Sequence, residues 1–148
     1  MKFHALIVGV SAVLLVGCST PFQGLKVRVQ SPPIEEAYKK LVLALQVDGY
    51  EMRDVNPGRF SLETSWRALK EKEKSEGDLK LTGTQIESKL TVRLERRGSL
   101  YDVFLSPSLR YHDGETLKEV VAGIHHPLWE KWRAVLSALL QMEAREED

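Results

Sequence analysis

The chain has 148 residues, with 21 Lys plus Arg and 21 Asp plus Glu, so its formal net charge at pH 7 is zero. This length suffices for one domain with a single hydrophobic core and is short for two. A neutral balance argues against nucleic acid, whose binding needs a basic surface, and offers no polybasic route to anionic lipid. With Cys18 as the only cysteine, an intrachain disulfide is excluded.

The N-terminus has the layout of a secretory leader. Lys2 precedes an apolar run over residues 5–16, which is too short to span a bilayer. The run ends at Leu15-Val16-Gly17-Cys18, which resembles the lipobox of bacterial lipoproteins, where a peptidase cuts before a cysteine that already carries a diacylglyceryl thioether. The resemblance implies a signal peptide over residues 1–17 and lipidation of Cys18.

Two alternatives stay open, namely an ordinary secreted leader and an uncleaved anchor. An unpaired thiol in an oxidising compartment is a liability that acylation would remove, which favours the lipoprotein. The resemblance also implies an outer-membrane location facing the periplasm, because the residue after the cysteine is Ser19 rather than aspartate. Residues 18–24 would then be a lipidated tether that lifts the domain, residues 25–143, by roughly 20 Å at most.

The first predicted elements are a strand and a helix. Residues 25–30 alternate apolar and polar side chains, the period of a half-buried strand. Ser31-Pro32 predicts a capped helix start, and the apolar positions that follow recur at helical spacing. Gly49 suits the left-handed residue that ends a helix.

A hairpin is predicted next. Residues 50–55 indicate a strand, Asn56-Pro57-Gly58 a turn, and residues 60–68 the returning strand. The positions expected to face inward on that strand are Phe60, Leu62, Thr64, Trp66 and Ala68. The charge-rich residues 70–80 then predict a mobile connection or a short solvated helix.

A second hairpin follows, with Arg97-Gly98-Ser99 as its turn. One arm buries Ile86, Leu90, Val92 and Leu94, and the other continues the alternation through residues 101–111. Pro107 within the second arm predicts a bulge or an edge.

A polar connection, helical by its spacing, is expected to lead to Ile124, and the last helix is expected to begin at Pro127. Trp132 is expected in the core and Trp129 half-buried at the helix edge, while residues 144–148 form an acidic tail. The order is therefore β-α-β-β-β-β-α. It predicts an α+β fold, a two-layer sandwich whose antiparallel sheet carries two helices on one face.

Candidate chemistry is sparse. The residues that could suggest a metal are His112, Asp113, Glu115, His125 and His126, but they lack His-x-x-x-His or Cys-x-x-Cys spacing. Ser106 and Ser108 lie outside any Gly-x-Ser-x-Gly elbow, and no glycine-rich phosphate loop occurs. We therefore predict no enzyme and no catalytic, metal or cofactor residues, which leaves Cys18 as the predicted site, for lipidation.

One group of core and turn positions resembles the start of a helix-grip domain. These residues are Ala37-Tyr38, Leu41, Leu45, Gly49-Tyr50, Asp54, Gly58, Phe60 and residues 64–66. They are similar to the helix-grip domains of the BamC (NlpB) lipoproteins, over residues 25–68. The resemblance implies a helix-grip-like fold and a place in the machinery that inserts β-barrels into the outer membrane.

Three functional hypotheses follow. The first is a lipid-anchored, non-catalytic accessory subunit that contacts envelope assembly proteins. The second is a domain that binds a small molecule or lipid in an apolar cleft between the sheet and the last helix. The third is an accessory lipoprotein of lipopolysaccharide export, similar in layout to LptE. The sequence leaves the oligomeric state open.

Overall fold

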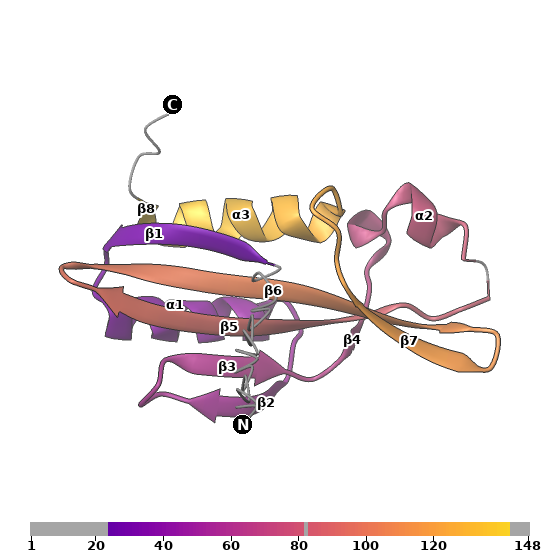
Figure 1. Ribbon diagram of the computed structural model, residues 1–148, viewed down its shortest axis with the longest axis horizontal. Helices are drawn as coiled ribbons and strands as arrows, with labels where there is room; N and C mark the ends of the chain where they lie inside the picture. The colour runs from indigo at the N-terminus through magenta and orange to yellow at the C-terminus, as the bar shows by residue number, and fades with distance from the viewer. Residues whose placement is uncertain (1–23, 82, 143–148) are drawn as a thin grey trace, which may run out of the picture.

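The computed structural model describes residues 24–81 and 83–142, so Cys18, the predicted signal peptide and the acidic tail lie outside the described residues. The fold is the predicted α+β architecture, an antiparallel sheet with α1 (Ile34–Val47) and α3 (Pro127–Leu139) behind one face (Figure 1). The strands are β1 (Leu25–Ser31), β2 (Met52–Asn56), β3 (Ser61–Thr64), β4 (Arg67–Ala68), β5 (Glu87–Arg97), β6 (Leu100–Asp113), β7 (Thr116–Val121) and β8 (Gln141–Met142).

The long hairpin of β5 and β6 forms the centre of the sheet, whose strand order is β2-β3-β5-β6-β1-β8. The β5–β6 register runs without a break from the pair Glu87 and Arg110 to the pair Arg97 and Leu100. β4 also pairs with β5, and β7 pairs with the far end of β6. Figure 1 shows the β6–β7 ribbon extending beyond the two long helices.

The core lies between the sheet and the two helices. On β5, Leu90, Val92 and Leu94 are buried as the alternation predicted, and Val103 and Leu105 of β6 lie directly opposite two of them. The helices contribute Ile34, Ala37, Tyr38, Leu41 and Leu45 from α1 and Leu128, Trp132 and Leu136 from α3. Burying each large aliphatic side chain stabilises the fold by about 1.5–3 kcal/mol relative to exposure.

Helix α1 ends as predicted but begins later. Gly49 has φ 95°, its amide donates to the carbonyl of Gln46, and the amide of Tyr50 donates to Leu45, which is the Schellman arrangement. At the other end, Pro33 precedes the first turn without a side-chain cap. Ser31 does not cap the helix because β1 continues through it to pair with β8.

The second arm of the first hairpin is not one strand. Ser65 and Trp66 separate β3 from β4, and this interruption shifts the alternation by one residue. Arg67 therefore faces the helices, whereas the ring of Trp66 lies under Lys89 at 5.0 Å and Arg110 at 4.5 Å on the opposite face. The prediction that Trp66 is a core residue was wrong, since it is half-buried on the other face, and Ala68, which was also expected to face inward, is exposed.

Pro107 lies in the middle of β6, opposite Leu90, and the β5–β6 register has no bulge there. On the other side of β6, β1 pairs with residues 101–105 and β7 with residues 108–113. Pro107 occupies the gap between them, where the missing N–H costs no ladder hydrogen bond. A local edge, rather than a bulge, explains the proline.

The connection after the second hairpin is a strand and not a helix. Leu117, Val120 and Val121 fit helical spacing, which is why the pattern misled, but Thr116–Val121 form β7 and pair with β6. Three of the six residues are β-branched, which favours a strand once β6 supplies a neighbour. Gly114, with φ 65°, makes the turn between the two strands.

Candidate functional site

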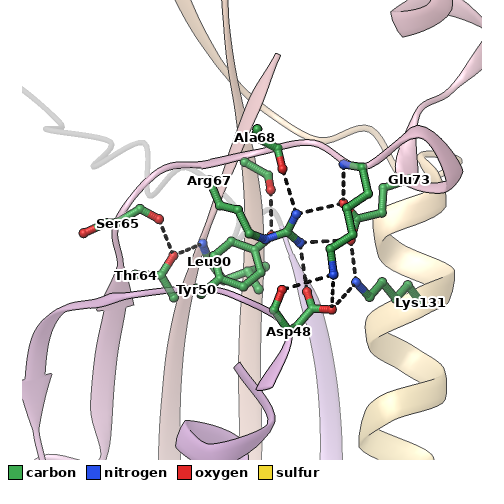
Figure 2. Close-up of polar contacts among 11 residues, drawn as sticks. Asp48, Tyr50, Thr64, Ser65, Arg67, Ala68, Glu73, Leu90 and Lys131 are labelled. Carbon is green, nitrogen blue, oxygen red and sulfur yellow. Dashed lines mark hydrogen bonds and ion pairs between the residues drawn. The ribbon is translucent and has the colours of Figure 1, made fainter. Parts of the chain in front are cut away.

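The charge-rich residues 70–80 fold into two short helical turns, η1 (Glu71–Glu73) and α2 (Glu76–Leu79). One glutamate of this segment enters a cluster of five charged side chains from four parts of the fold, shown in Figure 2. We name the set the buried ion cluster; its members are Asp48 after α1, Arg67 on β4, Lys70 and Glu73 around η1, and Lys131 on α3.

Glu73 is the centre of the buried ion cluster, and its side chain is only 1% exposed. Arg67 holds both of its carboxylate oxygens, with Nη1 to Oε2 at 3.0 Å and Nη2 to Oε1 at 2.9 Å. The amide of Lys70 donates to Oε2 at 2.8 Å, and the ammonium of Lys131 also donates to Glu73. Asp48 accepts from Arg67 at 2.8 Å and from Lys131 at 2.7 Å.

The guanidinium of Arg67 also stacks on the ring of Tyr50, 4.1 Å from its centre. The hydroxyl of Tyr50 lies 2.6 Å from Oγ of Ser88 on β5. A planar guanidinium suits this combination of a bidentate carboxylate and an aromatic face better than an ammonium would. Arg67 therefore joins the charged segment to the core of the sheet.

The protonation states follow from this geometry. Burial by itself would raise the pKa of Glu73, but hydrogen bonds from Arg67 and Lys131 outweigh it and lower the pKa from 4.5 to about 2. Burial raises the pKa of Tyr50 to about 12, so its hydroxyl stays neutral at pH 7. The charged groups of the cluster form ion pairs with one another. These ion pairs hold η1 against the end of α1 and against α3.

The three described histidines, His112, His125 and His126, do not come together as a metal site. His126 lies immediately before α3, where its Nδ1 accepts the amide N–H of Leu128 at 3.2 Å and its Nε2 lies 2.6 Å from Asp78 of α2. This arrangement assigns the Nε2–H tautomer. Within the described part of the chain, no group of three or more potential ligand side chains is arranged to hold a metal ion. His126 is thus the residue that caps the start of α3.

The last helix also places Trp129 as predicted. Its ring is half-buried, and its indole N–H donates to the carbonyl of Ala122 at 2.8 Å. This bond connects α3 to the end of β7, so the base of the β6–β7 ribbon is tied to the body of the fold.

The face of the sheet away from the helices has a shallow pocket of about 210 Å³. Asp54 and Glu63 lie on one side of it and Arg93 and Phe104 on the other. Pockets that hold small ligands usually measure about 300–1,000 Å³. This pocket is both smaller and on the opposite side of the sheet from the predicted cleft under the last helix.

The β6–β7 ribbon is the second notable surface. Leu117 is 47% exposed and Ile124 is 67% exposed, and Val120 and Val121 between them are also exposed. The amide of Ala122 donates to Pro107, so by antiparallel alternation the backbone groups of Leu117, Glu119 and Val121 point away from β6. Among the described residues β7 pairs only with β6, which leaves this edge unpaired.

These features define an antiparallel α+β domain with a buried ion cluster, a charged open sheet face and an apolar ribbon. No protein-family model matches the chain, and no curated protein matches it, so the lipobox and helix-grip resemblances stay predictions. None of the helices within residues 24–81 and 83–142 has the length and apolar character that crossing a membrane requires.

Proposed function

We propose that this protein is a lipid-anchored, non-catalytic module of the bacterial envelope, held at the outer membrane by Cys18 and facing the periplasm. It acts by contacting envelope assembly proteins. The lipobox Leu15-Val16-Gly17-Cys18 supports the anchor, and the short tether keeps the domain within roughly 20 Å of the lipid.

The observation that carries the contact role is the β6–β7 ribbon. Leu117, Val120 and Val121 expose aliphatic side chains along β7, whose outer edge is unpaired among the described residues, and Ile124 is exposed in the turn that follows. Exposed apolar patches mark interaction sites, and an open edge offers N–H and C=O groups to a partner strand. A protein that acts by contact needs a surface of this kind.

Site-specific photo-crosslinking tests the contact role. A photoreactive amino acid at Leu117 or at Val121 of the full chain should crosslink to envelope proteins in intact cells, because the ribbon carries the contact. The same amino acid at Leu43, which is exposed on α1, is the matched control and should give no specific product. Equal products from all three positions, or none from the ribbon, would contradict the proposal.

The lipid anchor has its own test. Cys18→Ser should leave an unprocessed precursor without fatty acid, because acyl transfer needs the thiol. Metabolic labelling with a fatty acid, followed by gel separation of precursor and mature forms, measures both effects. Labelled fatty acid on the Cys18→Ser protein would rule out lipidation at this residue.

The packing under α3 bears on the ligand-binding alternative. Leu128, Trp132 and Leu136 are at most 1% exposed, so side chains occupy the space between the sheet and this helix where the cleft was expected. The crosslinking experiment also tests a role in lipopolysaccharide export. Crosslinks to export proteins would support that role.

A further inference from the structure

The outer edge of β7 offers a row of backbone groups to a further strand. All six residues of β7 are exposed, and among the described residues the strand pairs only with β6. The N–H and C=O groups of Leu117, Glu119 and Val121 point away from β6, because hydrogen-bonded and outward residues alternate along an antiparallel pair. A strand added at this edge therefore has three residues of β7 with which to form backbone hydrogen bonds.

The side chains of the same three residues share one face of the sheet. Glu119 lies opposite Arg110 in the register with β6, and the guanidinium of Arg110 lies over the ring of Trp66 on the face away from the helices. Directly opposed residues share a face, as do alternate residues of one strand, so Leu117, Glu119 and Val121 all point to that face. The edge thus presents one carboxylate between two aliphatic side chains.

The carboxylate of Glu119 has no cation of its own. Arg110, its neighbour on β6, forms an ion pair with Glu87 of β5 at 2.6 Å. Lys118, its neighbour in sequence, points to the other face and pairs with Asp113. Within the part of the chain that the structure describes, Glu119 makes no ion pair. A Lys or Arg directly opposite Glu119 on an added strand would supply the matching charge.

The same geometry disfavours two other occupants of this edge. Two copies of β7 related by a two-fold axis pair all three outward residues only when Glu119 lies opposite the same residue of the second copy, and directly opposed like charges are destabilising. The hydrocarbon of a membrane offers no hydrogen-bond partner to the outward backbone groups or to the carboxylate. A strand of a different protein satisfies both the backbone and the charge.

We propose that β7 binds an extended strand of another protein as the next strand of the sheet, an inference that rests on the proposed contact role of the ribbon. The bound strand places a Lys or Arg opposite Glu119 and apolar side chains opposite Leu117 and Val121. Its sequence pattern is apolar-x-basic-x-apolar, which is the same in both strand directions. Backbone pairing supplies affinity, and the alternate side chains select the partner.

Hydrogen exchange with a synthetic strand tests this proposal. The probe is the end-capped peptide Thr-Val-Thr-Lys-Thr-Val-Thr, added in excess to the purified full chain, and NMR follows single amides. The amides of Leu117, Glu119 and Val121 should exchange several-fold more slowly with the peptide, because the added strand accepts their hydrogen bonds. The amides of α1, which lies behind the sheet, are the internal reference.

Backbone methylation of the probe distinguishes strand pairing from a contact between side chains alone. N-methylation of the Lys and Val residues of the peptide removes the N–H groups that face β7 and should abolish the slowing. N-methylation of the two inner Thr residues, whose N–H groups face away, is the matched control and should preserve it.

A charge exchange tests the choice of partner. The wild-type protein should prefer the peptide with a central Lys over the same peptide with a central Glu, and Glu119→Lys should reverse this preference. Glu71→Lys makes the same change at an 82% exposed side chain on η1 and should keep the wild-type preference.

The remaining outcomes overturn strand addition or separate it from the contact role. Equal slowing by the Lys and Glu peptides, or slowing that survives methylation of the facing amides, would overturn it. Slowing by phospholipid vesicles without peptide would assign the edge to a membrane surface instead. Specific crosslinks from Leu117 in cells, combined with no slowing by the peptide, would overturn strand addition and leave the contact role intact. Slowing by the peptide without crosslinks in cells would support strand addition and contradict the contact role.

Discussion

Glu73→Gln is expected to lower the free energy of unfolding by about 3–5 kcal/mol, the range for breaking a buried ion pair by removing one partner. The neutral amide keeps the shape of the side chain but leaves Arg67 and Lys131 with Asp48 as their only carboxylate in the buried ion cluster. Urea unfolding at pH 7, followed by circular dichroism, measures the change.

Glu71→Gln is the matched control for this substitution. Glu71 lies in the same short helical turn, but its side chain is 82% exposed and its contact is with Lys74 at 2.7 Å. Exposed ion pairs contribute about 0–1 kcal/mol, so the control should be nearly neutral. Similar losses of unfolding free energy in both variants would mean that the ion pairs of Glu73 do not contribute specifically to stability.

The pH dependence of stability gives an independent check on Glu73. Its folded-state pKa of about 2 lies below the ordinary value of 4.5, so the unfolded chain binds the proton more readily. Its contribution is therefore complete above pH 4.5 and is lost as the pH falls from 4.5 towards 2. The expected loss is on the order of 3–4 kcal/mol, at about 1.4 kcal/mol per unit of pKa difference. The Glu73→Gln protein should lack this part of the acid sensitivity.

The same ion pairs change the expectation for the charge-rich segment. A solvated connection would tolerate replacement of residues 72–76 by a glycine and serine linker, because loop closure depends weakly on composition. The structure instead places Glu73 in the buried ion cluster and the side chain of Asp78 against His126. The prediction of a short solvated helix holds for most of this run and was wrong at Glu73, because charge content alone does not show which carboxylate meets a buried arginine from another strand.

The elements predicted correctly are those with a long and regular apolar period. The alternation over β5 and the helical stripe from Leu128 to Leu136 on α3 are local patterns that burial then follows. The helix stop at Gly49 is equally local, since it depends on the freedom of one residue to adopt a positive φ. These elements sufficed to predict the two-layer α+β class.

The errors all occur where a neighbour in space overrides the local pattern. Trp66 lies outside the core because the strand is interrupted after β3, so that Arg67 faces the helices in its place. Thr116–Val121 became β7 because the end of β6 offered an unpaired edge. Ser31 belongs to β1 because it pairs with Gln141 of β8, a residue distant in sequence.

The candidate surfaces divide in the same way. Cys18 could be singled out from sequence because the lipobox is four consecutive residues. The β6–β7 ribbon could not, since its exposed edge depends on Thr116–Val121 pairing with the end of β6.

Leu136→Ala is expected to destabilise the domain by about 2–5 kcal/mol, the range for truncating a buried leucine to alanine. Leu136 is fully buried in the middle of the inward face of α3, so the lost methyl groups leave a cavity between the helix and the sheet. Leu43→Ala, at a 60% exposed position on α1, makes the same chemical change without a cavity and should leave stability within about 0.5 kcal/mol. Thermal and urea unfolding of the two variants measure the difference, and equal stabilities would mean that α3 does not pack through Leu136.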